Sequence, residues 1–314
     1  MLELTSASHT NVAANLAFIS FAIGEVLVAL AAYVTRDWQQ LKWTNTAFIG
    51  LGIPYLYFMP ESPLYVYSKR QYVQLETILR RIATTNGRNE SDWLPAYHEL
   101  VHHRPVPLLA RNEQRSTEPA YRLLTHPTSL VKLSIISLIG FTTLLLYIKI
   151  SYSLAVMPVS PYLAILIGAL VEAASYISSA LLIATPLGRK GSFTLLMSLT
   201  ILCLLLIPIT VKRSAIASVL IAQLGKYAIS GATAISWIFV PELFPTSIRG
   251  TANGLFIASS RLGAMISPII SASISDDYLP YTFYTSAVLA LVVLVASSVL
   301  PETKDKPMDD ALSL

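Results

Sequence analysis

The stretch Pro241-Glu-Leu-Phe-Pro-Thr-Ser-Ile-Arg-Gly250 is a short charged segment between two long apolar ones. Residues 215–240 before it contain one charged side chain, Lys226, and residues 251–275 after it also contain one, Arg261. So short a charged stretch cannot connect two water-soluble domains, but it suits the tight loop between two membrane-spanning helices. We therefore expect helices in lipid on both sides of this loop, because a helix satisfies its own backbone hydrogen bonds there.

The composition of the whole chain agrees with a membrane protein. Of its 314 residues, 54% are hydrophobic and 13% are charged, whereas about a quarter of the residues of a typical soluble protein are charged. The net charge of +4 comes without a basic patch interleaved with aromatic residues, so we expect no nucleic-acid partner. The single cysteine, Cys203, excludes an internal disulfide framework.

Eight segments are candidates for membrane spans, because a helix needs about 20 apolar residues to cross the hydrocarbon core. They lie near residues 13–35, 43–59, 130–151, 161–184, 191–210, 215–239, 251–273 and 281–300. The second segment is short, and we expect Pro54 and its aromatic residues to seat its ends at the interface. The sequence thus predicts an all-α membrane protein with eight transmembrane helices.

The distribution of Lys and Arg residues indicates the orientation of these spans. An even number of spans puts both termini on one side of the membrane. If that side is the cytoplasm, the inner loops hold fourteen Lys and Arg residues and the outer loops hold four, as expected of a positive-inside protein. Most of this bias comes from residues 61–129, without which the numbers are five and four.

Residues 61–129 form the only sizeable polar segment of the sequence. Ser62-Pro63 is typical of a helix start. Apolar residues then recur at helical spacing from Tyr72 to Ile82, and Asn86-Gly87 is a natural stop. We predict an amphipathic helix lying on the cytoplasmic side of the membrane, followed by a less ordered return segment.

One motif in this polar segment matches a pattern of zinc proteases. His98-Glu99-Leu100-Val101-His102 fits H-E-x-x-H, in which two histidines share one helix face. However, Pro105 and Pro107 end any helix here within a turn, and a polar loop is not the dry pocket that such chemistry requires. We therefore expect no metal site, no cofactor and no enzymatic activity.

Acidic turns recur at similar intervals near the two ends of the chain. Glu242 and Glu302 are separated by 60 residues and two spans, and Glu3 and Glu61 by 58 residues and two spans. This spacing suggests a duplicated transporter architecture with parallel halves. The alternative is a chance similarity among short turns.

The later of the two repeats carries a cation that the earlier one lacks. Arg249 lies seven residues after Glu242, whereas Thr10 holds the corresponding place after Glu3. A carboxylate and a guanidinium at such loops can form a bidentate ion pair that joins neighbouring helices on the cytoplasmic side. We predict this pair for Glu242 and Arg249.

Together these motifs resemble the major facilitator superfamily, and most closely its organic cation, organic anion and carnitine transporters. The segments that carry the likeness are Pro-Glu-Ser-Pro at 60–63, Leu-Arg-Arg at 79–81, Gly-Arg-Lys at 188–190, Leu-Gly-Lys-Tyr at 224–227, the decapeptide at 241–250, Ser-Arg-Leu-Gly at 260–263 and Pro-Glu-Thr-Lys at 301–304. Sugar porters share the turn motifs and a tryptophan like Trp237, but the span at 130–151 lacks the paired glutamines expected of a sugar porter. A sugar-porter-like transporter is therefore the alternative.

The resemblance implies twelve spans in two halves of six, of which this chain would hold the fifth to the twelfth. The expected divisions are 1–60 for the last two spans of the N-terminal half, 61–129 for the central cytoplasmic loop, 130–300 for the C-terminal six-helix half and 301–314 for a cytoplasmic tail. With four spans missing, we expect a truncated product or an incomplete gene model that does not complete alternating access alone. The resemblance places it in the plasma membrane with both termini cytoplasmic.

The function that the resemblance implies is transport of a small organic ion across the lipid bilayer, with an unknown coupling ion. An alternative from another class is a non-transporting half that associates with a full-length relative and modulates it. Ionisable residues inside spans are candidates for such functions, because an unpaired charge in lipid costs several kcal/mol.

Arg261 lies near the middle of the span at 251–273. The resemblance associates an arginine at this place with anionic or zwitterionic substrates, such as carnitine, and an aspartate with cationic ones. The alternative is that Arg261 only pairs with a carboxylate such as Glu172. Glu25 lies midway along the first apolar run, and we expect its cation to be in the missing region.

Two further pairs of residues share helix faces. Lys226 and Trp237, three turns apart, would present a cation and an aromatic wall to a central cavity; the alternative is a snorkelling lysine and an interfacial tryptophan. Glu172 and Tyr176 are four residues apart. Glu172 could carry a coupling proton, but we favour a structural role in which it counters Arg261.

The span at 130–151 departs from the resembled family. Tyr147 and Ser151 match its aromatic–glycine stretch, but Ile148 and Lys149 replace a tyrosine and the glycine, which leaves gating and substrate class open. Lys149 either faces the substrate or reaches the outer interface. The predicted substrate-binding residues are thus Arg261, Lys226, Trp237, Tyr147, Lys149 and Tyr176, and the predicted structural or coupling charges are Glu172, Glu242, Arg249, Arg189, Glu61 and Glu302.

Overall fold

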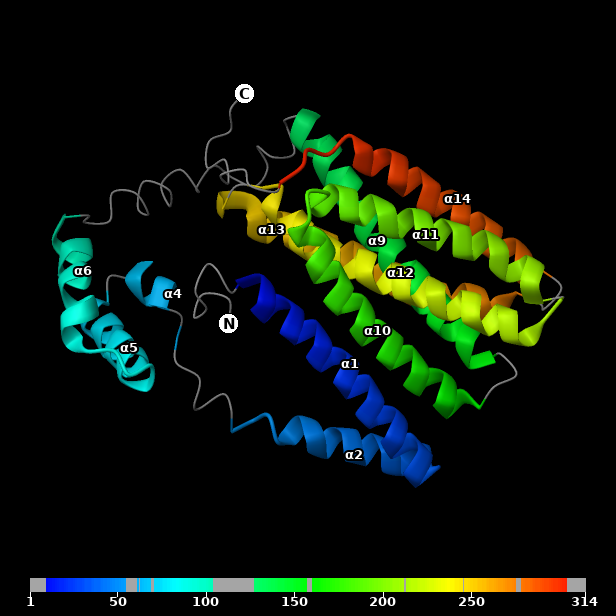
Figure 1. The fold of residues 1–314 in the computed structure, drawn as a ribbon, viewed down its shortest axis with the longest axis horizontal. Helices are drawn as coiled ribbons and strands as arrows, with labels where there is room; N and C mark the ends of the chain where they lie inside the picture. The colour runs from blue at the N-terminus through cyan, green and yellow to red at the C-terminus, as the bar shows by residue number, and fades with distance from the viewer. Residues whose placement is uncertain are drawn as a thin grey trace. The chain divides into compact units, whose positions relative to one another are not determined.

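The structure is a computed structural model that describes residues 10–54, 61, 63–68, 71–103, 127–156, 160–211, 213–244, 246–274 and 278–303. Within these ranges every regular element is an α-helix (Figure 1). The chain divides into two compact units. The small unit consists of Met1–Ala14 and Lys42–Pro119, and the large unit consists of Asn15–Leu41 and Ala120–Leu314.

The large unit is a bundle of long helices. Its C-terminal part contains α9 (Pro127–Val156), α10 (Pro161–Ala184), α11 (Gly188–Val211), α12 (Ala215–Glu242), α13 (Thr246–Ser273) and α14 (Leu279–Ser298). From Asn15 onward, α1 (Thr10–Thr35) belongs to the same unit and lies along α10 (Figure 1). The rings of Phe18 and Tyr176 are 5.3 Å apart near one end of this contact, and those of Tyr33 and Tyr162 are 5.6 Å apart near the other.

Seven of the described helices, α1 and α9 to α14, are long and apolar enough to cross a membrane, close to the predicted eight. The predicted span at 43–59 overlaps α2 (Trp38–Gly50), which has 13 residues and is followed by a turn through Pro54. Thirteen residues of helix extend only about 20 Å, short of the roughly 30 Å of hydrocarbon. Residues 55–59 of that predicted span lie outside the described ranges.

Local sequence explains where several helices begin and end. The Ser160 hydroxyl accepts a hydrogen bond from the Leu163 amide at 3.3 Å, and Pro161 occupies the first helical position of α10. The Ser214 hydroxyl caps α12 in the same way. Arg36 adopts a φ of 51°, the left-handed conformation that commonly terminates a helix, directly after α1.

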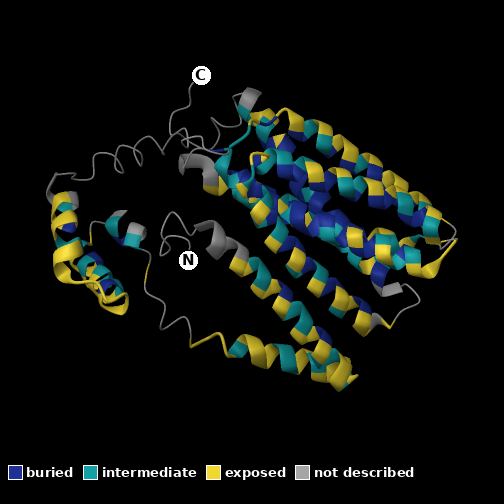
Figure 2. Cartoon of the chain, viewed as in Figure 1, coloured by how far each residue is buried: buried dark blue, intermediate teal, exposed yellow. Residues whose placement is uncertain are grey.

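The core of the large unit lies along α9, α11 and α12, whose central parts are buried, whereas the outer faces of the bundle are exposed (Figure 2). Leu181, Leu220 and Val288 are among the apolar side chains on the exposed faces, as expected where lipid is the solvent. Glycines allow α9 and α13 to approach closely. A Cβ atom on Gly140 would lie 2.7 Å from the Phe256 carbonyl oxygen, and one on Gly263 would overlap the Phe141 backbone.

The small unit contains α4 (Pro63–Ser68), α5 (Tyr72–Thr85) and α6 (Glu90–His103). The helix predicted over 62–86 is therefore present as two helices. The second ends just before Gly87, whose φ of 63° suits a helix stop. Leu75 of α5 packs with Val66 and Tyr97 in a small apolar core.

The prediction of a less ordered return segment is wrong for residues 90–103, which form α6. Two local features favour a helix there. Glu90 and Asp92 place negative charge in the first turn, which complements the helix dipole. The Tyr97 side chain is buried, and its hydroxyl donates a hydrogen bond to the Tyr72 carbonyl at 2.9 Å, which joins α6 to α5. Residues 104–126 lie outside the described ranges.

Candidate functional site

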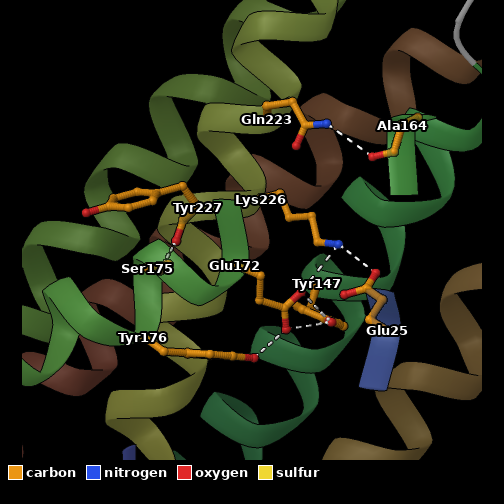
Figure 3. Close-up of polar contacts among 9 residues, drawn as sticks. All are labelled: Glu25, Tyr147, Ala164, Glu172, Ser175, Tyr176, Gln223, Lys226 and Tyr227. Atoms are coloured by element: carbon orange, nitrogen blue, oxygen red, sulfur yellow. Dashed lines mark hydrogen bonds and ion pairs between the residues drawn. The ribbon is translucent and has the colours of Figure 1, made fainter. Parts of the chain in front are cut away.

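A cluster of charged side chains lies inside the large unit, where α1, α10 and α12 meet (Figure 3). The Lys226 ammonium of α12 is 2.9 Å from the Glu25 carboxylate of α1 and 3.3 Å from the Glu172 carboxylate of α10. The exposed fractions of the side chains are 3% for Lys226, 0% for Glu172 and 24% for Glu25. Because burial of a single charge is so costly, the three groups stabilise one another only as long as they remain together.

The space for the Lys226 ammonium comes from a glycine on the neighbouring helix. A Cβ atom on Gly168 of α10 would lie only 2.9 Å from the Lys226 nitrogen. Further polar contacts hold α10 to α12 on both sides of this point. The Ser175 hydroxyl donates to the Tyr227 carbonyl at 2.5 Å, and the Gln223 amide donates to the Ala164 carbonyl at 3.4 Å (Figure 3).

Glu172 also accepts hydrogen bonds from two tyrosines. The Tyr147 hydroxyl of α9 lies 2.9 and 3.0 Å from its two oxygens, and the Tyr176 hydroxyl donates to it from the next turn of α10. The predicted common face of Glu172 and Tyr176 is thus present as a direct contact. The predicted pairing of Glu172 with Arg261 is wrong, because the cation beside Glu172 is Lys226.

Glu25 likewise has its cation within this chain. The expectation that its partner lies in a missing region is wrong, since Lys226 is 2.9 Å away although it lies 201 residues further along the chain. The alternative of a snorkelling Lys226 is excluded by its burial and its two carboxylate partners. Trp237 has a different neighbour: its ring packs edge-on against Phe256 of α13, with the centroids 5.6 Å apart.

Arg261 lies within the apolar part of α13 and its side chain is exposed. Among the residues that the structure describes, it forms no salt bridge with a carboxylate: the described carboxylates inside the spans are paired elsewhere, Glu25 and Glu172 with Lys226, and Glu242 with Arg189. Arg261 therefore presents its charge at the surface of the large unit.

Lys149 lies inside the large unit, beside the first turn of α14. Its side chain is buried in the large unit, and its ammonium donates a hydrogen bond to the Thr282 carbonyl of α14 at 2.7 Å. The same nitrogen lies 5.0 Å from the centre of the Phe283 ring, in the geometry of a cation–π contact.

The turn charges meet at the end of the large unit where α11 begins and α12 ends. The Arg189 guanidinium is 2.7 Å from the Glu242 carboxylate. Glu302 accepts hydrogen bonds from the backbone amides of Arg189 and Lys190 at 3.0 and 2.9 Å, so it caps the positive end of α11. Thr303 donates to Glu242 at 2.9 Å. We refer to Arg189, Glu242, Glu302 and Thr303 as the turn network.

The predicted pair of Glu242 and Arg249 stays a prediction, because the Arg249 side chain lies outside the described residues. The cation that the structure places on Glu242 is Arg189. Glu61 belongs to the small unit, where its carboxylate is exposed and accepts a hydrogen bond from the Gln74 side chain at 3.3 Å.

The histidine motif lies on α6. No group of three or more His, Cys, Asp and Glu side chains that could hold a metal ion is found within the described part of the chain. The His102 side chain itself lies outside that part.

Comparison with known proteins gives the family. A profile described as "Sugar (and other) transporter" matches residues 3–312, nearly the whole chain. The chain belongs to this transporter family. A solved structure of a major facilitator superfamily proton:xylose symporter, bound to 6-bromo-6-deoxy-D-glucose, matches with a TM-score of 0.69 at 19% identity, over 98% of this chain and 68% of that one. At this identity the likeness shows the fold alone, which is the predicted major facilitator fold.

The relatives among curated proteins are solute carriers. The chain is 30% identical to solute carrier family 22 member 12 of Mus musculus, over 99% of this chain and 56% of that protein. It is 28% identical to solute carrier family 22 member 13 of Homo sapiens (99% and 54%) and 26% identical to organic cation/carnitine transporter 2 of Homo sapiens (94% and 51%). The predicted resemblance is confirmed, and the chain spans about half the length of these relatives.

Some residues of the site were not singled out in the sequence. Gly168 gives Lys226 its space, and Lys190 donates through its side chain to the Ser298 and Leu300 carbonyls at 2.6 and 2.7 Å. Lys190 could have been found, since it belongs to the Gly-Arg-Lys turn that carries the resemblance. Nothing in the sequence distinguishes Gly168 from the other glycines, because its role depends on a side chain of another helix.

Proposed function

We propose that the chain takes part in the transport of small organic ions by alternating access, with anions and zwitterions such as carnitine favoured over cations. The observation that carries this proposal is the exposed Arg261 within an apolar span, with no carboxylate partner among the described residues. A guanidinium can bind a carboxylate through two parallel hydrogen bonds, so a substrate carboxylate would suit Arg261 as a partner.

The other charges in the spans support the same preference. Glu25 and Glu172 are already occupied by Lys226, so they are poor recognition groups for an organic cation. Lys226 is neutralised in turn and is better suited to hold α1, α10 and α12 together than to bind substrate. Aromatic and polar groups are also offered by Tyr147 on α9, Tyr176 on α10 and Trp237 on α12. We propose these three residues as secondary contacts of the substrate.

The proposed arrangement in the membrane follows from the charge of the loops. Both termini and residues 61–129 lie in the cytoplasm in this proposal, and the membrane is the plasma membrane, as the resemblance implies. The turn network then faces the cytoplasm, where its ion pair would hold the end of α12 against the start of α11. Residues 1–60 and 130–300 contribute to the two halves of the carrier, with 301–314 as its tail.

Uptake measurements test this proposal. The chain would be expressed alone and also joined to the first four spans of a related solute carrier, which completes twelve spans, because carriers of this fold work by motion of two halves. Cells would be offered a labelled aromatic carboxylate, labelled carnitine, a labelled quaternary ammonium ion and labelled xylose. We expect saturable uptake of the carboxylate or carnitine by the joined protein, at least tenfold reduced by Arg261→Ala and partly kept by Arg261→Lys.

The control variant is Lys132→Met, which removes a cation near the start of α9 instead of from α13. It should leave uptake unchanged at equal surface expression. Preferred uptake of the ammonium ion, or uptake that Arg261→Ala leaves intact, would refute the anion preference. Preferred uptake of xylose would support the sugar-porter-like alternative.

A second candidate function is modulation of a full-length relative by a chain that does not transport. It is the alternative from another class that the sequence leaves open. This function requires that the chain co-purifies with a full-length carrier and reduces its uptake on co-expression. Unchanged uptake at equal expression of the carrier would exclude it.

A further inference from the structure

A cavity of about 400 Å³ lies among α9, α13 and α14 of the large unit. It is separate from the Lys226 cluster, which shares none of its lining residues. The volume falls in the range of about 300–1,000 Å³ that ligand pockets show. Its walls include Leu145 and Lys149 of α9, Ser267 and Ile270 of α13, and Thr282 and Leu289 of α14.

Lys149 brings a positive charge with unused donors to this cavity. The side chain is 5% exposed, and the ammonium donates one hydrogen bond, to the Thr282 carbonyl. An ammonium has three N–H donors, so two are available. No carboxylate among the described residues forms a salt bridge with it. A buried cation is costly unless an anion balances it, so Lys149, which has no anionic partner within the described ranges, is a functional candidate inside its span.

Ser267 adds a second polar group that lacks a partner. Ser267 is 2% exposed, and its hydroxyl oxygen has no hydrogen-bond partner within the described structure. Such groups are rare in folded proteins, because an unmade hydrogen bond in the interior costs free energy. Ser267 lies on α13 and Lys149 on α9, so two helices supply an unused donor to the same cavity independently.

The rest of the cavity wall suits an apolar body. Leu145, Ile270 and Leu289 line it, and Tyr278 and Tyr281 lie at the end of the bundle where α14 begins. These two tyrosines are 64% and 63% exposed, as in the aromatic belts at membrane interfaces. On the predicted topology this is the outer face, so the cavity would open near the headgroup level of the outer leaflet.

We propose that this cavity binds an amphipathic monocarboxylate. Its carboxylate accepts hydrogen bonds from the Lys149 ammonium and the Ser267 hydroxyl, and its hydrocarbon chain lies against Leu145, Ile270 and Leu289. One ammonium and one neutral hydroxyl match a single negative charge. The binding does not depend on transport, and it concerns a position at which the chain departs from the family that it resembles. The carboxylate can come from water, as a medium-chain acid, or from the membrane, as a long-chain fatty acid.

Equilibrium binding to the purified full chain in nanodiscs tests the charge requirement. Labelled decanoate is the probe, with decanol and decyltrimethylammonium as neutral and cationic competitors of the same chain length. We expect decanoate to bind at least tenfold more tightly than either competitor, because a hydrogen bond to a charged group is worth about a factor of ten or more. Equal binding of the three compounds, or preference for the cation, would overturn the proposal.

Variants assign the binding to the cavity. Lys149→Met should weaken decanoate binding at least tenfold, Ser267→Ala about threefold, and Lys149→Arg should keep most of it. Lys132→Met, which removes a lysine from the opposite end of the same helix, is the matched control and should bind like the unchanged protein. Unchanged binding by Lys149→Met would overturn the proposal.

Photocrosslinking gives a result that does not need a folded variant. A fatty acid with a diazirine in its chain is added to the unchanged protein, either from solution or already within the nanodisc lipid. We expect labelled peptides from α9, α13 and α14 around Leu145, Ile270 and Leu289. Labelling elsewhere, with these peptides unlabelled, would refute the site. The more efficient of the two routes of addition identifies the source of the carboxylate.

Discussion

Replacement of Lys226 with methionine removes the one cation from a cluster of two carboxylates. Methionine keeps an unbranched chain of similar length, so the change acts mainly on charge. In the variant, the fully buried Glu172 keeps, among the described residues, the hydroxyls of Tyr147 and Tyr176 as partners. Removal of one partner from a buried ion pair costs about 3–5 kcal/mol, because the other charge stays behind in a medium that does not solvate it. We expect Lys226→Met to lower the free energy of unfolding by this amount.

Two companion variants separate the contributions of the carboxylates. Glu25→Gln leaves the closely buried pair of Lys226 and Glu172 intact. Because the Glu25 side chain is 24% exposed and partly screened, we expect a loss of about 1 kcal/mol or less. The double variant Lys226→Met with Glu172→Gln contains no fully buried charge in the cluster, so it should recover at least half of the loss caused by Lys226→Met alone.

The measurement is unfolding of the purified chain in mixed micelles of a mild detergent and sodium dodecyl sulfate, followed by tryptophan fluorescence and helical circular dichroism. The reasoning would be refuted if Lys226→Met lay within about 1 kcal/mol of the unchanged protein. It would also be refuted if Lys226→Met and Glu172→Gln had additive effects, because side chains in one ion-pair cluster should show a coupling of about 0.5–3 kcal/mol.

Three further predictions concern the packing and the turn network. Gly168→Ala places a methyl group 2.9 Å from the Lys226 nitrogen, so it should lower the free energy of unfolding by about 1–3 kcal/mol in the same assay. Added to Lys226→Met, which lacks this nitrogen, the same change should cost much less. Gly263→Ala should lower the free energy of unfolding by more than Gly168→Ala, because its Cβ atom would overlap the Phe141 carbonyl oxygen, and a backbone atom cannot move aside as a lysine ammonium can. Gly254→Ala on the same helix meets nothing within 4 Å and should be harmless, so equal effects of Gly263→Ala and Gly254→Ala would contradict the structure. Arg189→Gln and Glu242→Gln should each lower the free energy of unfolding by about 1 kcal/mol, because each removes one partner of the 2.7 Å ion pair. The double variant should lose no more than the more damaging single variant. Strictly additive losses would show that this ion pair contributes nothing.

The helices could be predicted from the sequence because lipid imposes a simple rule on composition. Each of the long apolar runs from residue 130 onward became a helix of membrane-spanning length. The run at 43–59 shows the limit of the rule. Its first part contains Thr44, Asn45 and Thr46, and α2 has no buried residue, so hydropathy alone placed the span where the described helix is too short.

The candidate site could be predicted only in part, because local and long-range contacts leave different signals. Glu172 and Tyr176 lie one helical turn apart, and their common face followed from helix periodicity. The contact of Glu25 with Lys226 joins residues 201 positions apart, and no spacing rule reaches that far. For this reason the sequence suggested a missing cation for Glu25 and the wrong partner for Glu172.

The turn network includes a contact from another helix that the sequence did not predict, whereas the predicted pair of Glu242 and Arg249 stays a prediction. The motifs at 188–190, 241–250 and 301–304 were recognised separately, and the acidic residues at two of them suggested ion pairs. The sequence favoured Arg249 for Glu242 because it is close in the chain. In the structure Arg189 reaches Glu242 from the start of another helix, and Glu302 binds the amides beside it.

The central claim is that Arg261 recognises the negative charge of an organic substrate, and charge reversal tests it most directly. The protein joined to the first four spans of a related carrier would be compared with its Arg261→Asp variant for uptake of a labelled carboxylate and a labelled quaternary ammonium ion, at equal surface expression. We predict that the variant loses carboxylate uptake at least tenfold and gains uptake of the ammonium ion relative to it. Carboxylate uptake that persists unchanged in the Arg261→Asp variant would contradict the account.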